Sequence, residues 1–301
     1  MKVDYGLKDN IMAASPSHKL GQLIGNLLED LFIPLLKTLS QKSNIYLDIV
    51  GHSREARKGK KITWNDSYGS SHDLDFVFEY DGSETKLGRP IAFIESAWRR
   101  YTKHSKNKAQ EIQGAILPIA DKYWIECPFK GAILAGEFTE PSLKQLEKCG
   151  FEVLYIHYKD FVAAFNTVGI DISFDEDTPE SVLKTKVHCV ENLDKQTLNK
   201  VKNFILIKNN DKILEFTKKL EQKIQKTLEY IIISPLYGHD IKFNHIEEAK
   251  NFIRFYEKDS TPSNLQFKKF IIKIKYINND NIEAAFSNTA TALNFLDKIL
   301  H

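Results

Sequence analysis

The chain has 301 residues, enough to bury a full hydrophobic core as one elaborated domain or two modest ones. Its 42% hydrophobic and 27% charged residues are ordinary for a folded protein, and a net charge of +2 excludes attraction of nucleic acid by overall charge alone. Apolar runs fall short of the roughly 18–20 residues that span a bilayer. The N-terminus lacks the apolar segment of a signal peptide, so we expect a cytoplasmic protein with no membrane partner.

Hydrophobic periodicity divides the first 170 residues into alternating helices and strands. Helical spacing of leucine and isoleucine predicts a long first helix at 17–40, which Pro34 should kink or divide. Apolar runs bounded by turn residues predict strands, and these lie at 45–50, 74–80, 91–97, 131–135 and 153–157. Further helices are expected at 109–119, 140–149 and 158–168. This order is typical of an α/β core in which a mixed β-sheet is flanked by helices.

An acidic stretch at 171–180 marks the expected boundary between two regions. Beyond it the sequence is rich in Lys, Asn and Ile, and the periodicity predicts helices at 194–207, 211–232 and 244–257. A hairpin at 267–286 and a terminal helix complete the chain. We therefore predict two domains, a core at residues 1–170 and a mainly helical region at residues 181–301.

Two acidic strand segments are the main candidates for chemistry. Side chains alternate faces along a strand, so Asp73, Asp75 and Glu79 should point away from the core. Glu95 stands near the end of an apolar strand, where a lone carboxylate is costly to bury unless a cation pairs with it. Neighbouring strands would set Asp75 beside Glu95. Carboxylates so placed can hold Mg²⁺, which activates water and stabilises charge on a phosphate during phosphodiester hydrolysis.

Each acid alone also has a structural interpretation. Asp75 could be a polar strand residue, and Glu95 could form a salt bridge to a helix, because Asp and Glu mostly serve such roles. The two acids together, followed by a basic segment at 99–108, favour the metal site over that alternative.

Positive charge is dense in two segments. The segment 54–61 lies in a loop before the first acidic strand, where it suits either a DNA groove or a solvated surface. The segment 99–108 directly follows Glu95, which favours phosphate contact. Arginine can also read guanine edges, whereas lysine mainly holds phosphate. The candidate DNA-binding residues are Arg54, Arg57, Lys58, Lys60, Lys61, Arg99, Arg100, Lys103 and Lys106.

The order and spacing of these pieces resemble the PD-(D/E)XK nuclease superfamily, especially its type II restriction endonucleases, over about residues 20–160. The family's first motif acid matches Asp75, with Asp73 as the fallback, and its second matches Glu95. Glu29, in Gly25-Asn26-Leu27-Leu28-Glu29, is similar to a first-helix glutamate that approaches the metal in many members. The resemblance implies a restriction endonuclease-like core in which Asp75, Glu95 and Glu29 are catalytic. These three acids, together with Asp73, are then the expected metal ligands.

One position departs from the family pattern. The second acid is normally followed two residues later by lysine, and here that position is Ala97. Some members supply the lysine from the next helix. Lys108 lies at the edge of the inward face of that helix and is the first choice as a catalytic residue, ahead of Lys103 and Lys106. A lysine there would orient the attacking water and offset charge on the phosphate.

The resemblance implies site-specific, Mg²⁺-dependent cleavage of double-stranded DNA. It further implies a homodimer, since protein symmetry can mirror a palindromic target, and a cognate DNA methyltransferase that acts on the same site. Residues 181–301 would supply recognition, dimerisation or both. Two alternatives stay open: a catalytically degenerate DNA-binding protein with a nuclease-like core, which Ala97 favours, and a repair or recombination nuclease.

Overall fold

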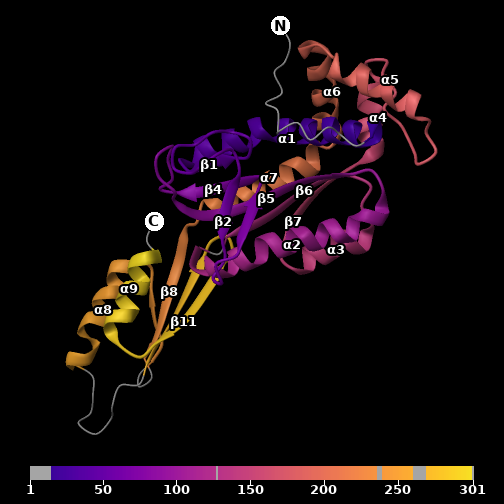
Figure 1. The fold of residues 1–301 in the computed structure, drawn as a ribbon. Coiled ribbons are helices and arrows are strands. Elements are labelled where there is room, and N and C mark those ends of the chain that lie inside the picture. Colours follow the sequence, from indigo (N-terminus) through magenta and orange to yellow (C-terminus); the bar gives the residue numbers. More distant parts are fainter. Residues whose placement is uncertain (1–14, 127, 236–238, 260–268, 300–301) are drawn as a thin grey trace. The chain divides into compact units, whose positions relative to one another are not determined.

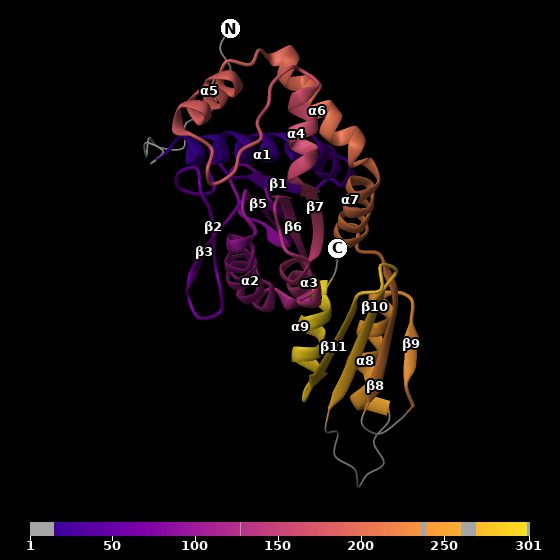
Figure 2. The ribbon, with the colours of Figure 1, turned by 90° about the vertical axis from the view of Figure 1, so that its right-hand side faces the viewer.

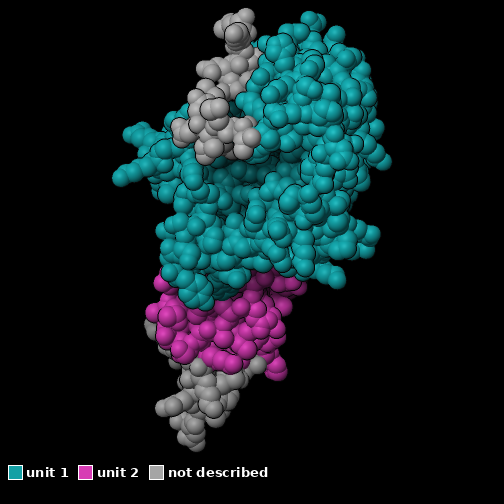
Figure 3. All heavy atoms as spheres, turned by 45° about the vertical axis from the view of Figure 1, so that its right-hand side comes forward, with its two compact units in different colours: residues 1–124, 128–224 teal, residues 125–127, 225–301 magenta. Residues whose placement is uncertain are grey.

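The computed structural model describes residues 15–126, 128–235, 239–259 and 269–299. The chain divides into two compact units (Figure 3), of which unit 1 comprises residues 1–124 and 128–224 and unit 2 comprises 125–127 and 225–301. The expected boundary at 171–180 is therefore wrong. The helices between 180 and 224 belong to unit 1, because their apolar residues join the same core as the first helix.

A five-stranded mixed sheet with the order β1-β4-β5-β6-β7 forms the centre of unit 1. Strands β1 (Tyr46–Ile49), β4 (Phe76–Tyr80) and β5 (Arg89–Arg99) are antiparallel neighbours. Strands β6 (Phe129–Gly136) and β7 (Glu152–His157) continue the sheet parallel to β5. The predicted α/β core with a mixed sheet is confirmed.

Helices cover both faces of this sheet (Figures 1 and 2). One face packs against α1 (Pro16–Ser43), α4 (Tyr158–Asn166) and α7 (Asn210–Ile224). Helices α5 (Glu180–Glu191) and α6 (Lys195–Lys208) pack on the outer side of this layer, α5 against α1 and α6 mainly against α4. The other face packs against α2 (Ser105–Lys122) and α3 (Glu140–Lys148). Strand β5 serves both layers: Ile94 faces the α1 side, while Phe93 faces the α2 side. Alternation along a strand explains this division.

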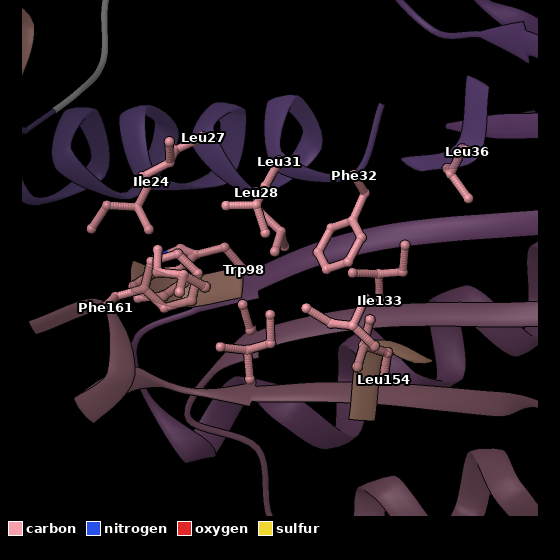
Figure 4. Close-up of a cluster of buried hydrophobic side chains, with 14 of the residues drawn as sticks. Ile24, Leu27, Leu28, Leu31, Phe32, Leu36, Trp98, Ile133, Leu154 and Phe161 are labelled. Atoms are coloured by element: carbon pink, nitrogen blue, oxygen red, sulfur yellow. The ribbon is translucent and has the colours of Figure 1, made fainter. Parts of the chain in front are cut away.

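Helix α1 runs unbroken through Pro34, so the predicted division is wrong. Its apolar side chains pack on the sheet both before and after the proline, at Phe32 and Leu36 (Figure 4). This packing compensates for the backbone hydrogen bond that Pro34 cannot donate. The Thr38 hydroxyl donates to the Pro34 carbonyl at 2.9 Å. Ser15 begins the helix by accepting from the His18 amide, and Asn44 ends it in the left-handed conformation.

The strand predicted at 74–80 is interrupted at Asp75. Strands β2 (Ile62–Asn65) and β3 (Ser71–Leu74) form a separate two-stranded hairpin, and β4 begins one residue after Asp75. The expected common face of Asp73, Asp75 and Glu79 is therefore wrong, since Asp73 is exposed and Glu79 is buried. Short 3-10 turns, Thr102–His104 and Trp124–Glu126, stand at the two ends of α2.

Unit 2 is an antiparallel sheet with two helices. Its strand order is β11-β10-β8-β9, and its elements are β8 (Leu228–Pro235), β9 (Ile241–Phe243), α8 (Ile246–Asp259), β10 (Phe270–Tyr276), β11 (Asn281–Phe286) and α9 (Thr289–Ile299). The prediction of a mainly helical C-terminal region is wrong for this unit. The helix expected at 211–232 ends at Ile224, because Ile231 and Ile233 alternate into the core as strand residues. The predicted hairpin is confirmed from residue 270 onward, and residues 267–268 lie outside the described part.

No helix within the described residues is both long enough and apolar enough to cross a membrane.

Candidate functional site

Asp75 and Glu95 lie side by side where β4 begins, next to the middle of β5. Strands β4 and β5 pair Phe76 with Ile94, and continuing this register by one residue sets Asp75 opposite Glu95. The Asp75 carboxylate is held there by Ser96, whose backbone amide and hydroxyl donate to Oδ2 at 2.8 and 3.1 Å. The Asp75 carbonyl accepts from the Val50 amide at 2.9 Å, which fixes the backbone at the break between β3 and β4.

Glu95 is buried and electrostatically crowded. Its residue surface is only 8% exposed, and burial raises the pKa of its carboxyl well above the ordinary value. The charge of Asp75 raises this pKa further and Glu29 adds a smaller effect, while Lys108 and the Asp75 backbone lower it. Desolvation and like charge disfavour an ionised carboxylate, whereas a nearby cation favours it. Glu29, Asp75, Glu95 and Lys108 therefore form one interacting cluster, which we call the acid cluster.

Lys108 reaches the acid cluster from α2. Its side chain is 18% exposed and lies 3.3 Å from Glu111 Oε2. The other two lysines considered for this role are placed differently: the Lys103 side chain pairs with Glu176, and Lys106 is exposed. The structure thus brings the first-choice lysine to Glu95 from the helix that follows β5.

A cavity of about 390 Å³ opens beside the acid cluster, between α1 and the end of β5. Glu29, Ser96 and Lys108 belong to its wall, as does Trp98, which packs beneath α1 (Figure 4). The remaining basic groups in the wall are His18, Arg99 and Arg100. A space of this size, with cations beside the Glu29 carboxylate and Ser96 connecting its wall to Asp75, suits a phosphate-bearing ligand.

The three acids do not converge on one point. Across the described ranges, no group of three or more His, Cys, Asp or Glu side chains is arranged to hold a metal ion. Glu29 affects the pKa of Glu95 only weakly, as the last of the causes that act on it. Asp75 and Glu95 are therefore the candidate pair. Their oxygen donors fit Mg²⁺, which keeps several water ligands and needs only one or two protein carboxylates.

Asp73, the predicted fallback ligand, lies away from the acid cluster. It is exposed on the outer face of the β2–β3 hairpin, where Lys61 Nζ and Thr63 Oγ1 each donate to it at 2.7 Å. The hydrogen bond from Lys61 is the largest cause that lowers the pKa of Asp73. The prediction of Asp73 as a metal ligand is wrong. The strand is interrupted at Asp75, so Asp73 belongs to the separate hairpin, while Asp75 directly precedes β4 of the main sheet and lies beside Glu95.

Arg54 is not a DNA contact, contrary to prediction, because it is buried. Its Nη1 donates to Asp48 Oδ2 at 2.8 Å and to Glu79 Oε1 at 2.6 Å, and its Nη2 donates to Glu79 Oε2 at 3.0 Å. Arg57 donates to both Asp48 oxygens at 2.9 Å, so it too is turned inward. Buried carboxylates need such partners. Both arginines attach the loop 51–61 to strands β1 and β4.

The other predicted basic residues remain at the surface. Lys58, Lys60 and Lys61 are exposed, although Lys61 pairs with Asp73. Arg100 is half-buried: its Nε donates to the Phe174 carbonyl at 2.7 Å, and its guanidinium lies 4.1 Å from the centre of the Tyr158 ring. Arg99 Nη1 donates to the Trp98 carbonyl at 2.8 Å. Both arginines line the cavity, so both can contact a phosphate that enters it.

Sequence reasoning missed the role of Ser96 and of the buried acids Asp48 and Glu79. The only feature of the sequence that could have indicated the role of Ser96 is its position directly after Glu95. Asp48 pairs across the sheet with Val77, and Glu79 with Tyr46, so their shared arginine joins segments far apart in the sequence. Nothing in the local pattern indicates such a network.

No family model and no curated protein matches this chain. Among solved structures, the chain is similar to a protein of unknown function, AF1548, at 10% sequence identity and a TM-score of 0.29. That match covers 62% of this chain and 99% of the other. A similarity so low carries no weight for fold or function, so the geometry of the acid cluster has to support any assignment.

Proposed function

We propose that the protein is a Mg²⁺-dependent endonuclease of the PD-(D/E)XK type that cleaves double-stranded DNA as a type II restriction endonuclease. The observation that carries the proposal is the acid cluster. A buried glutamate lies beside a second carboxylate that is held in place, and a lysine from the next helix acts on the same glutamate. This arrangement is the one that metal-assisted phosphodiester hydrolysis needs.

Each residue has a distinct role in this proposal. Asp75 and Glu95 would hold Mg²⁺, which when bound supplies a Lewis acid for the phosphate and lowers the pKa of a bound water. Ser96 fixes the rotation of the Asp75 carboxylate through its two hydrogen bonds. The Lys108 ammonium orients the attacking water and offsets charge that develops on the phosphate. Glu29 adds negative charge on the α1 side of the cluster.

The cavity wall places Arg99 and Arg100 next to the acid cluster. Cations at this place attract the DNA backbone and offset repulsion between phosphate and carboxylates. Arg100 is stacked on Tyr158 and bonded to a carbonyl, so little side-chain freedom is lost when it contacts phosphate. A homodimer and a cognate DNA methyltransferase are part of the same proposal, because a palindromic target requires symmetry and host DNA requires protection.

The position of Lys108 favours an active enzyme over a degenerate DNA-binding protein. The degenerate alternative rests on Ala97, which stands where the family has lysine. Lys108 lies in the same cavity wall as Ser96, and its charge lowers the pKa of Glu95 from the neighbouring helix, so a lysine acts on the acid despite the alanine.

Incubation of the purified protein with unmethylated phage DNA and Mg²⁺ tests the proposal. We expect discrete fragments from the wild type and from Asp73→Asn, and none from Asp75→Asn or Glu95→Gln. Asp73→Asn is the matched control, because this acid is exposed and lies two residues from Asp75. Binding without cleavage in Mg²⁺ or Mn²⁺ would establish the degenerate alternative. Cleavage confined to branched DNA would establish a repair or recombination nuclease.

A further inference from the structure

The β2–β3 hairpin presents an almost fully exposed tyrosine on a hydrogen-bonded turn. Tyr68 is 94% exposed. The turn that carries it is bonded together by Asp66: Oδ1 accepts from the amides of Tyr68 at 2.8 Å and Ser70 at 2.9 Å, and Oδ2 lies 3.1 Å from His72 Nε2. The Asp66 amide in turn donates to the Ser70 carbonyl at 3.0 Å. The exposure of this large aromatic side chain therefore results from a specific turn.

The hairpin is also fixed against the core of unit 1. The Trp64 ring packs edge-on against Tyr123 at 5.5 Å and against Phe93 at 6.4 Å, measured between ring centres. Lys122 Nζ, at the end of α2, donates to the carbonyls of Asn65 at 2.8 Å and Asp66 at 3.3 Å. In Figure 2 the hairpin extends beside α2. Its direction relative to the sheet is therefore set by packing and hydrogen bonds.

One end of the hairpin joins the acid cluster directly. Strand β3 ends at Leu74, and the next residue is Asp75. From Ser70, at the end of the turn, to Asp75 is five extended steps of about 3.3 Å each, so the turn that carries Tyr68 lies roughly 16 Å from Asp75. The exposed Lys58 and Lys60 lie at the Asp75 end: the Lys60 carbonyl accepts from the Gly51 amide, while the Val50 amide donates to Asp75.

We propose that residues 58–74 form a DNA-contact arm that binds the duplex about half a helical turn from the bond cut at the acid cluster. Lys58 and Lys60 contact backbone phosphates near that bond, and the Tyr68 ring packs against sugars and base edges in the groove beyond. At 3.4 Å per base pair, a span of about 16 Å corresponds to roughly five base pairs. This inference rests on the proposed function, because the acid cluster defines where the cut occurs.

The charges and the aromatic group of the arm complement a duplex. Exposed lysines neutralise phosphates and make binding depend on salt, whereas an aromatic ring contacts any base or sugar without needing a particular sequence. Arg54 and Arg57 hold the base of the arm through Asp48 and Glu79 and contribute no contact of their own. Arg54 and Arg57 therefore stabilise the base of the arm, whereas Lys58 and Lys60 are exposed and can bind phosphate.

Equilibrium binding to a random-sequence 30-base-pair duplex in Ca²⁺ tests the arm, together with cleavage kinetics in Mg²⁺. We expect Tyr68→Ala to weaken binding about tenfold and Tyr68→Phe to bind like the wild type, because the ring makes the contact. Tyr68→Ala should raise KM and leave kcat within about twofold. The Lys58→Gln/Lys60→Gln double variant should lower the slope of log affinity against log salt by about 2.

Matched surface changes serve as controls. Leu214→Ala removes a side chain that is 57% exposed on α7, and Lys184→Gln/Lys200→Gln removes two exposed lysines from α5 and α6. Neither should change affinity or salt slope. Each variant should unfold at the wild-type temperature, since none of these side chains is buried.

The outcomes separate the arm from the proposed function. If the wild type cleaves DNA and the arm variants bind and cleave like the controls, the arm is wrong and the nuclease assignment stands. If the wild type binds DNA without cutting it and the arm variants bind more weakly, the arm is a DNA contact and the nuclease assignment fails. A wild type that binds no duplex overturns both.

Discussion

Ser96 donates two hydrogen bonds to one oxygen of Asp75, and Ser96 is also the residue that follows Glu95. Strand β5 therefore supplies one acid of the candidate pair and orients the other. Both bonds reach Oδ2, so the rotation of the Asp75 carboxylate is set from a rigid central strand. A carboxylate that is held in place before the metal arrives loses less freedom on binding it.

Ser96→Ala removes the hydroxyl bond and keeps the amide bond. We expect kcat to fall about two- to tenfold, the equivalent of one neutral hydrogen bond, with little change in KM for DNA. Ser96→Thr keeps the hydroxyl and should restore kcat. Steady-state cleavage at saturating Mg²⁺ measures both variants. Equal losses in alanine and threonine variants would show that bulk at this position matters, and that the hydroxyl bond does not.

Lys108→Met removes the ammonium group that acts on Glu95. We expect kcat to fall about 100-fold or more, because the loss leaves developing charge uncompensated in a buried place. Lys106→Met is the matched control: it lies two residues earlier on α2, is exposed, and should keep wild-type kcat. Single-turnover cleavage with excess enzyme makes the comparison independent of DNA release. Full activity in Lys108→Met would mean that another group performs its role.

The meeting of Asp75 and Glu95 could be predicted from the sequence because it depends on local rules. Asp75 directly precedes β4 and Glu95 lies within the apolar strand β5, and neighbouring antiparallel strands bring such positions together. Lys108 followed from helical spacing in the same way. These contacts need only the correct elements in the correct order.

Other parts of the fold depend on contacts that no local pattern encodes. Arg54 sits in a run of positive residues that is typical of a surface, yet two acids on separate strands bind it inside the protein. Strand β8 follows α7 after three residues, and its isoleucines extend a pattern that also fits a helix. Pairing with β10 decides in favour of the strand. Tertiary contacts override local preference in both cases.

Arg54→Ala should destabilise unit 1 by about 3–5 kcal/mol, because it leaves the Glu79 carboxylate buried without its cation and Asp48 with Arg57 alone. Lys58→Ala, in the same loop and exposed, should change the free energy of unfolding by less than about 0.5 kcal/mol. All three tryptophans lie in unit 1, so denaturant unfolding followed by tryptophan fluorescence reports on this unit. A small effect of Arg54→Ala would contradict the buried network.

Asp48 should make unit 1 sensitive to acid. Burial tends to raise the pKa of Asp48, but hydrogen bonds from Arg57 and Arg54 outweigh it, and the pKa ends below the ordinary 3.8. A lowered pKa in the folded state means that the ionised carboxylate stabilises the fold fully above the unfolded-state pKa of 3.8, and that this contribution is lost as pH falls through the lower folded-state pKa. The free energy of unfolding of the wild type should therefore fall more steeply than that of Asp48→Asn as pH drops below about 5 and on through pH 3. Glu55→Gln, in the same loop and exposed, should follow the wild-type profile.

Gly136 ends β6 in contact with the backbone of Arg99, close to the cavity. Its φ is +103°, and a Cβ atom there would lie 2.0 Å from the Arg99 carbonyl oxygen, which also accepts from the Glu137 amide at 2.7 Å. Gly136→Ala should therefore cost more than about 3 kcal/mol, or displace Arg99 from the cavity wall and raise KM for DNA. Gly114→Ala is the control, because Gly114 lies in α2 with nothing within 4 Å of a Cβ atom. It should stabilise the helix by up to about 1 kcal/mol. If Gly136→Ala unfolds and cleaves like the wild type, the close approach of β6 to Arg99 does not hold in solution.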